Sequence, residues 1–157
     1  MTEAHETNVT RAMEVGERGY VITRILDVPR DLVFQAWTTP EHLSQWWGPK
    51  GFTNTFQEFD LKPGGVWRFI MHGPDGVDYP NRITVLEVVP DERIVFEHHG
   101  PNFRATATFE DLDGKTRLTY RTLFETTATF DVVKTFAVPG GEQTFDRLEA
   151  HLVSQHG

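Results

Sequence analysis

The sequence predicts one α+β domain, in which a curved antiparallel sheet of about seven strands wraps around a long C-terminal helix. Three observations lead to this fold class. A run of β-branched and aromatic residues, 20–28, precedes two short segments of helical spacing. Residues 52–124 then alternate polar and apolar side chains with a period of two, interrupted by turns. Residues 127–152 return to helical spacing, and nothing in the sequence repeats, so a single domain is expected.

Length and composition set the outer limits of this prediction. We expect residues 1–18 to be a loose polar leader and residues 19–155 to form the domain, since 157 residues are enough for one core. Cysteine is absent, which excludes disulfides, thiolate metal sites and cysteine nucleophiles. No apolar run reaches the ~18 residues of a membrane span, and the polar N-terminus does not resemble a signal peptide. These features predict a cytoplasmic protein without a membrane span.

The net charge of −8 bears on the choice of partner. A field of this sign repels polyanions, so nucleic acid is not expected as a partner. The charge by itself is consistent with solubility. No feature of the sequence specifies an oligomeric state.

The first strand is expected over residues 20–28, and a short helix follows it. Pro29 suits the first helical turn, where its missing N–H costs nothing. Val33, Ala36 and Trp37 then recur at helical spacing and give the helix one apolar stripe.

A second short helix carries two adjacent tryptophans. Thr39 is the expected N-cap and Pro40 the first helical residue, and the Gly-Pro pair at 48–49 ends the helix. Two consecutive helical residues point about 100° apart, so only one can point squarely into the core. We expect Trp46 to pack between the short helices and the sheet, and Trp47 to border a cavity. The alternative is that both belong to the core.

Six further strands are expected between residues 52 and 124. The Gly-Pro-Asp-Gly turn at 73–76 forms a hairpin, and Pro80 within the next strand indicates a bulge or an edge position. One face of these strands is too aromatic to stay exposed to water. It carries Trp67, Phe69, Met71, Phe96, Phe109, Leu118, Tyr120 and Phe124.

The C-terminal part is expected to cover that face as two helices. The first is capped by Thr127 and runs to about Phe136, and a flexible hinge at Pro-Gly-Gly 139–141 precedes the longer second one. The longer helix has a narrow apolar stripe, whereas its outer face is expected to hold Glu142, Asp146, Arg147 and Glu149. A stripe this narrow does not fill a curled sheet, so we expect an aromatic cavity, which is the default candidate for a binding site.

Several segments together resemble the START-like (helix-grip) superfamily. They are "DVPRDLVFQAWTTPEHLSQWWGP", "EFDLKPGGVWRF", "MHGPDGVDYPNRITVLEVVPDERIVF", "TFEDLDGKTRLTY" and "QTFDRLEAHL". The resemblance covers roughly residues 20–152 and is strongest to the branch related to the C-terminal domain of activators of the heat-shock chaperone ATPase. This branch is also similar to polyketide cyclase and dehydrase-like proteins. The resemblance implies a deep cavity between the sheet and the C-terminal helix, with its mouth near the short helices and strand loops.

The ligand expected in this cavity is a small hydrophobic or aromatic molecule, and no cofactor is indicated. The residues predicted to bind it are Trp47, Trp67, Phe69, Met71, Tyr79, Phe96, His98 and Tyr120. His98 shares a face with Phe96 and either enters the cavity or is satisfied by other hydrogen bonds. His98 and His99 point to opposite faces of a strand and cannot chelate one ion together. No local metal-ligand spacing or nucleophile motif occurs, so neither a metal site nor a catalytic residue is predicted.

Three functions compete at this point. The first is a module that binds the hydrophobic or aromatic ligand. The second is an enzyme of the cyclase, dehydratase or hydrolase type, which needs polar groups such as His98, Tyr79 and Tyr120 to converge in the cavity. The third is a co-factor that stimulates a chaperone ATPase, an analogy at the level of the fold.

Overall fold

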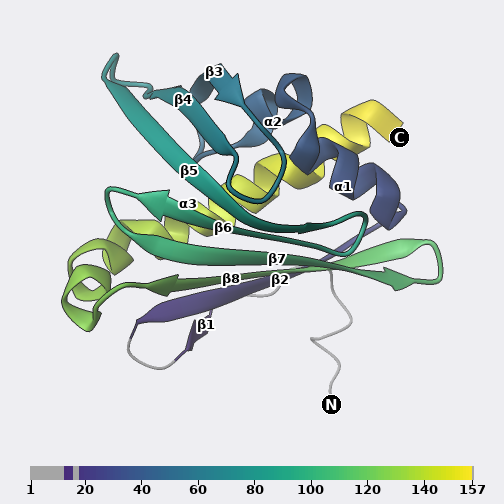
Figure 1. The fold of residues 1–157 in the computed structure, drawn as a ribbon. Coiled ribbons are helices and arrows are strands. Elements are labelled where there is room, and N and C mark those ends of the chain that lie inside the picture. The colour runs from purple at the N-terminus through teal and green to yellow at the C-terminus, as the bar shows by residue number, and fades with distance from the viewer. Residues whose placement is uncertain (1–12, 16–17, 157) are drawn as a thin grey trace.

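A computed structural model describes residues 13–15 and 18–156 of the chain. It contains an eight-stranded antiparallel sheet that curves around one long helix, with two short helices beside it (Figure 1). The elements, in chain order, are β1 (Met13–Val15), β2 (Gly19–Leu26), α1 (Arg30–Thr38), α2 (Pro40–Trp46), β3 (Thr53–Phe59), β4 (Val66–His72), β5 (Asp78–Val89), β6 (Arg93–His99), β7 (Phe103–Leu112), β8 (Lys115–Phe124) and α3 (Thr127–His156). The predicted α+β class is confirmed.

The strand order is β1-β2-β8-β7-β6-β5-β4-β3, so the first long strand lies beside the last. The seven strands β2–β8 correspond to the seven that the sequence predicts. The eighth, β1, pairs Met13–Val15 with the start of β2 and lies within the segment expected to be a loose leader. The rest of that leader, apart from Arg18, lies outside the described residues.

Pro80 is accommodated because β5 extends past the end of its neighbour β6. On the β4 side Pro80 pairs with Ile70, but pairing with β6 begins only at Arg82. The missing N–H of the proline therefore falls where β5 is locally an edge, which is one of the two predicted situations. The bulge in this strand lies further along, between Val85 and Glu87.

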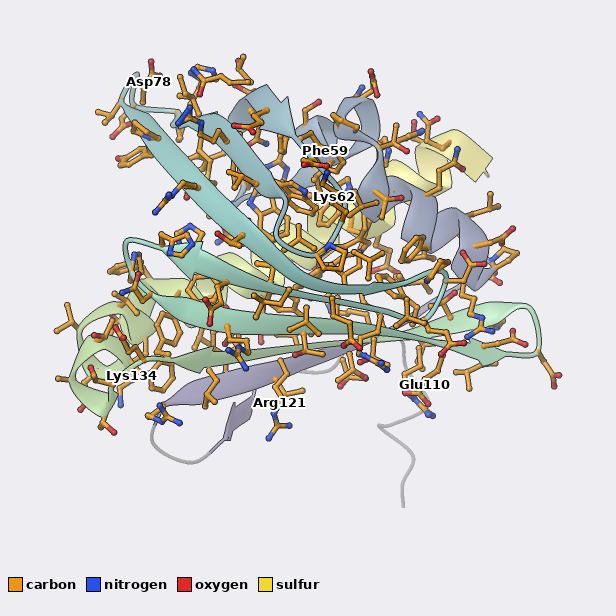
Figure 2. The ribbon with its side chains drawn as sticks, in the orientation of Figure 1. Phe59, Lys62, Asp78, Glu110, Arg121 and Lys134 are labelled. Carbon is orange, nitrogen blue, oxygen red and sulfur yellow. The ribbon has the colours of Figure 1, made fainter. Side chains whose placement is uncertain are left out.

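The two short helices pack on the concave face through tryptophans. Trp46 is fully buried, and its indole Nε1 donates a hydrogen bond to the Ala36 carbonyl oxygen over 3.1 Å. Trp37 is equally buried, with its ring centroid 5.1 Å from that of Trp46. Pro29 is the N-cap of α1 and not part of its first turn, because α1 begins at Arg30. On the convex face, charged side chains such as Arg121 point away from the helices (Figure 2).

The C-terminal part is one helix of 30 residues, so the prediction of two helices with a hinge is wrong. Pro139 lies inside α3, and Gly140 and Gly141 continue it. The glycines serve close packing: a Cβ on Gly140 would lie 3.3 Å from Pro49, and one on Gly141 would lie 2.9 Å from Ile22 Cδ1. Their small size lets α3 lie directly on the sheet and the α2–β3 loop, and this packing carries the helix through a sequence of low propensity.

The start of α3 also differs from the prediction by one residue. Thr126, not Thr127, is the capping residue, since its Oγ1 accepts a hydrogen bond from the Thr129 backbone N–H over 3.0 Å. Thr127 is the first helical residue. The capping chemistry is the expected one, a threonine hydroxyl that satisfies an otherwise unpaired N–H.

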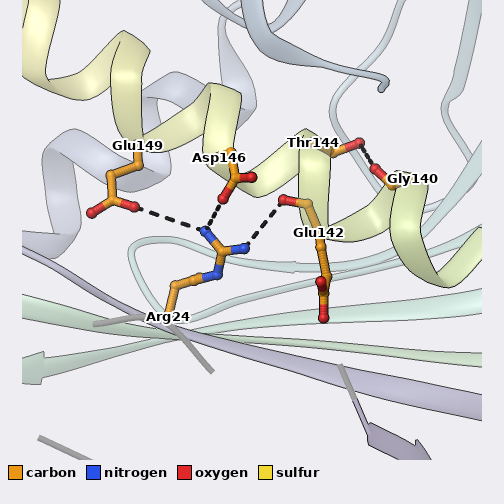
Figure 3. Close-up of polar contacts among 6 residues, drawn as sticks. All are labelled: Arg24, Gly140, Glu142, Thr144, Asp146 and Glu149. Atoms are coloured by element: carbon orange, nitrogen blue, oxygen red, sulfur yellow. Dashed lines mark hydrogen bonds and ion pairs between the residues drawn. The ribbon is translucent and has the colours of Figure 1, made fainter. Parts of the chain in front are cut away.

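The charged residues expected on the outer face of α3 contact other elements, although the Asp146 side chain remains 64% exposed. Arg24 of β2 is 2% exposed, and its Nη1 lies 2.9 Å from Asp146 Oδ1 and 3.8 Å from Glu149 Oε1 (Figure 3). Its Nη2 donates to the Glu142 carbonyl oxygen over 3.1 Å. Carboxylates on α3 thus compensate a guanidinium that the sheet buries, and they bind the helix to β2.

Candidate functional site

A cavity of about 210 Å³ lies between the inner face of the sheet and α3. The strands and the loops beside them contribute mainly apolar and aromatic side chains to its wall. These residues are Tyr20, Trp47, Gly48, Pro49, Met71, Asn81, His98, Pro101, Phe103, Tyr120 and Phe124. An engineered apolar cavity of about 150 Å³ is large enough to bind benzene, so this one has room for a somewhat larger molecule.

The helix supplies the opposite wall. Its lining residues are Val133, Phe136, Ala137, Gly140, Gly141, Thr144 and Phe145. Phe136 marks the mouth, because its side chain lines the cavity and yet is 66% exposed.

Four of the eight predicted ligand-binding residues line this cavity: Trp47, Met71, His98 and Tyr120. The other four do not, and they are Trp67, Phe69, Phe96 and Tyr79.

The structure places three of those four in the core. Trp67, Phe69 and Phe96 are at most 1% exposed. Trp67 and Phe69 are covered by aromatic rings of β3, with ring centroids 4.6 Å from Phe59 and 4.8 Å from Phe56. These residues share the predicted face, but side chains fill the space above that part of the sheet.

Tyr79 lies near the tip of the β4–β5 hairpin. It pairs with Met71, is 43% exposed and has its ring centroid 5.9 Å from that of Phe52. It therefore does not converge with His98 and Tyr120, as an enzyme built on these three residues would need.

Trp47 forms part of the cavity rim and is half-buried. Its ring centroid lies 5.7 Å from Trp37 and 6.3 Å from Phe96. The next residue, Gly48, has a φ of 97° and would place a Cβ 2.6 Å from Met71 Cε, so only glycine fits there without displacement. The tight turn after α2 thereby brings the indole and the Met71 thioether to the same cavity.

Arg147 of α3 fixes this rim from the opposite side. Its Nη1 donates to the carbonyl oxygens of Trp47, Gly48 and Pro49 over 3.1, 2.9 and 3.0 Å. Burial lowers the pKa of this guanidinium from its ordinary value, but the group stays charged at neutral pH. The arginine satisfies the carbonyls at the end of α2 and holds the rim against α3.

His98 lines the cavity, but both of its ring nitrogens are engaged. Nδ1 lies 2.9 Å from the Pro101 carbonyl oxygen, and Nε2 lies 2.6 Å from Asn81 Oδ1. Burial lowers the pKa of His98 in spite of the hydrogen bond to Pro101, and His99 lowers it further. The lowered pKa favours a neutral imidazole, which has one N–H and can donate to only one of these two oxygens. The ring lies between Pro101 and Asn81 in the cavity wall.

Two tyrosines stand side by side on the cavity floor. Tyr120 pairs with Ile22, and Tyr20 lies two residues away on the same strand, so the two rings are diagonal neighbours on one face. Burial raises the pKa of Tyr20 to about 12, an effect that a hydrogen bond with the Thr122 side chain partly offsets. Burial also raises the pKa of Tyr120 well above its ordinary value, and Tyr20 adds to this shift. Both phenols therefore keep their protons at neutral pH.

A second polar cluster lies on the other face of the sheet. His72 Nδ1 is 2.7 Å from Asp78 Oδ1, and its Nε2 is 2.8 Å from Thr55 Oγ1. This is the hydrogen-bond order of a hydrolase triad, but all three groups are solvent-accessible and point away from the cavity. We assign the cluster to cross-strand pairing between β3, β4 and β5.

The lining residues of α3, together with Tyr20 and Phe103, are not among the residues predicted to bind a ligand. A signal for the helix exists, since Val133, Phe136, Ala137 and Gly140 follow one another at spacings of three, one and three residues. The predicted hinge concealed it, because the two parts of α3 were treated as separate helices. Tyr20 alternates with Ile22 and so carried a period-two signal.

Within residues 13–15 and 18–156, no group of three or more His, Cys, Asp or Glu side chains is placed to hold a metal ion. Over the same residues, no helix combines the length and apolar character needed to cross a bilayer.

The sequence of the chain was compared with models of protein families and with curated proteins. The family model described as "Activator of Hsp90 ATPase homolog 1-like protein" matches residues 27–153. No curated protein matches the chain.

Among solved structures, a crystal structure of a Nitrosomonas europaea protein is 26% identical, with a TM-score of 0.83, and the match covers 90% of this chain and 97% of that one. A Mycobacterium smegmatis protein is also 26% identical, with a TM-score of 0.85 and coverages of 94% and 99%. A solution structure from Arthrobacter aurescens, with 23% identity, a TM-score of 0.87 and coverages of 94% and 93%, shares the fold.

Proposed function

The chain belongs to the Activator of Hsp90 ATPase homolog 1-like family, and we propose that it acts as a binding protein whose cavity takes a small hydrophobic or aromatic molecule. The observation that carries the proposal is the cavity of about 210 Å³ under α3, walled mainly by aromatic and aliphatic side chains. Burial of a ligand's apolar surface there supplies the driving force. The few polar groups in the wall set its orientation.

Titration with naphthalene, followed by NMR of the Met71 and Ala137 methyl groups, tests this proposal. Both residues line the cavity, so the ring current of a bound naphthalene should shift both methyl resonances with one saturating binding curve. Ala137→Phe places a ring inside the cavity and should abolish the shift. Trp47→Ala should reduce the free energy of naphthalene binding by more than it reduces the free energy of unfolding.

Val132→Phe is the matched control. Val132 is on the same half of α3 but is 74% exposed and does not line the cavity. This variant should bind naphthalene like the wild type. Absence of saturable binding in the wild type, or equal loss in both phenylalanine variants, would count against the proposal.

Cyclase, dehydratase or hydrolase chemistry is the second candidate. It is favoured by the presence of His98 and Tyr120 in one cavity. It is weakened by the position of Tyr79 outside and by the carbonyl partners of both His98 nitrogens. Release of product from a bound ester or hydroxy-ketone, lost in Tyr120→Phe, would favour it over simple binding.

A chaperone co-factor is the third candidate, suggested by the description of the family. Stimulation of a chaperone ATPase by the purified chain would support it, and the absence of co-purification at high concentration would exclude it. We also propose a cytoplasmic location, which fractionation of cells can test.

A further inference from the structure

Tyr120 has a buried ring, and its hydroxyl is accessible from the cavity. The side chain lines the cavity and is 5% exposed. Its ring is fixed between Trp37 and Phe145, with centroid distances of 5.9 and 4.9 Å. No group in the described part of the chain forms a hydrogen bond with its hydroxyl. A ligand that fills the cavity covers this hydroxyl, and it avoids the cost of an unpaired donor only if it accepts the hydrogen bond itself.

The other polar groups of the wall already have neighbours to bond to, and the Tyr20 hydroxyl has the Thr122 side chain. His98 faces two carbonyl oxygens. Asn81 Nδ2 donates to the Tyr79 carbonyl oxygen over 2.8 Å, and Thr144 Oγ1 donates to that of Gly140 over 2.8 Å. The Tyr120 hydroxyl is therefore the group best placed to form a hydrogen bond with a polar atom of a ligand.

The charge of the wall limits the ligand further. Among the described residues that line the cavity there is no lysine, arginine, aspartate or glutamate. An ionised ligand would lose its hydration there without gaining a counter-charge, which is strongly unfavourable. Because burial raises the pKa of Tyr120, its hydroxyl stays protonated and acts as a donor. A neutral acceptor complements this site best.

We infer that the ligand is a neutral, mainly aromatic molecule with one carbonyl oxygen, which accepts a hydrogen bond from the Tyr120 hydroxyl. The inference rests on the proposed binding function. The cavity volume suits a molecule larger than benzene, about the size of two fused rings. The carbonyl supplies the acceptor, and the rings fill the space beneath α3.

Three compounds of matched size test the inference: 2-acetylnaphthalene, 2-ethylnaphthalene and 2-naphthoate. Their dissociation constants are measured by calorimetry with the wild type, with Tyr120→Phe and with Tyr20→Phe. The informative quantity is the Kd of the ketone divided by the Kd of the hydrocarbon, because it cancels the shared effects of each variant on the cavity. Tyr120→Phe should raise this ratio about tenfold, whereas Tyr20→Phe should leave it within about twofold.

The anion 2-naphthoate should bind at least about tenfold more weakly than the ketone. Naphthoate binding as tightly as the ketone would overturn the neutral class. A ratio unchanged in Tyr120→Phe, or changed only in Tyr20→Phe, would overturn the role of Tyr120. If none of the compounds binds to the wild type, the binding function itself fails, which separates the two results.

A second measurement does not depend on the variants. In the complex of the wild-type protein, the carbonyl stretching band of 2-acetylnaphthalene should lie at lower frequency than in hexane, because the oxygen accepts a hydrogen bond. A band at the hexane position would contradict the inference. Tyr120→Phe itself should change the stability of the fold little, since it removes no hydrogen bond between described residues.

Discussion

Residues 142–152 and residues 127–139 belong to the same helix but are held in different ways. The later segment buries Phe145, Leu148 and Leu152 at 2% exposure or less. The earlier segment buries one large side chain, Phe130 at 1% exposure, whereas Val132 is 74% and Phe136 is 66% exposed. The later segment thus anchors α3 on the sheet, and the earlier one covers the cavity as its wall and mouth.

The polar contacts repeat this division. Arg24 and Arg147 connect the later segment to β2 and to the α2–β3 loop. In the earlier segment, Lys134 forms an exposed ion pair with Asp131 of the same helix over 3.3 Å. Stabilising contacts and space for a ligand therefore lie in adjacent parts of one helix, separated by Pro139. This arrangement keeps the cavity open without weakening the attachment of α3.

The largest effect is expected from truncating the anchor. Leu148→Ala removes a fully buried side chain and should lower the free energy of unfolding by about 2–5 kcal/mol. Val132→Ala, in the cavity segment, should change it by no more than about 0.5 kcal/mol. Urea denaturation measures both. Similar losses in the two variants would remove the distinction between the segments.

The second-largest effect is expected at alkaline pH, which should lower the free energy of unfolding through the tyrosines of the cavity. The pKa of Tyr20 is about 12 in the folded protein against an ordinary 10.0, so between these values the unfolded chain releases a proton that the folded one retains. Stability is unaffected below about pH 10 and falls by about 2–3 kcal/mol toward pH 12. Tyr120 acts in the same direction, since its pKa is also raised.

Tyr20→Phe isolates this contribution. The Tyr20 ring stacks near Phe130 of the cavity segment, with centroids 6.4 Å apart. The variant should lose less stability than the wild type above about pH 10, measured by urea denaturation at each pH. Identical pH profiles would show that the Tyr20 phenol is not protected by burial.

The smallest effect is expected at the junction of the segments. Pro139→Ala restores an N–H that can bond to the Thr135 carbonyl oxygen four residues earlier, and it should stabilise the cavity segment. The gain is partly offset because the unfolded chain becomes more flexible without the proline. Hydrogen exchange of residues 127–138 should slow, whereas exchange of residues 142–152 should not change. Equal slowing in both segments would mean that α3 opens as one unit.

Much of the fold could be predicted from the sequence because its determinants are local. The period-two pattern between residues 52 and 124 and the tryptophans beside Gly48-Pro49 set the strands, the short helices and the face that packs inward. Trp46 is buried, and Trp47 lines the cavity. Trp46 is the last residue of α2 and Trp47 is its extended C-cap, so the two indoles point in different directions where the helix ends.

The ligand site could be predicted only in part from local sequence patterns. A period of two says that Trp67 and Tyr120 share a face, but it does not say what lies above each of them. Aromatic rings of β3 cover Trp67, whereas Tyr120 faces the space under α3. That difference depends on contacts between segments far apart in the sequence.

By itself, then, the sequence determined the α+β class, the strand faces and the helix boundaries around the tryptophans, because these follow from the spacing of nearby side chains. The tertiary structure alone decided that α3 runs unbroken through Pro139, that Arg24 is buried against Asp146, and that the cavity lies beneath residues 133–145. Packing against distant elements can offset the low helix propensity of a segment and the cost of burying a charge. Neither effect can be predicted from the neighbouring residues in the sequence.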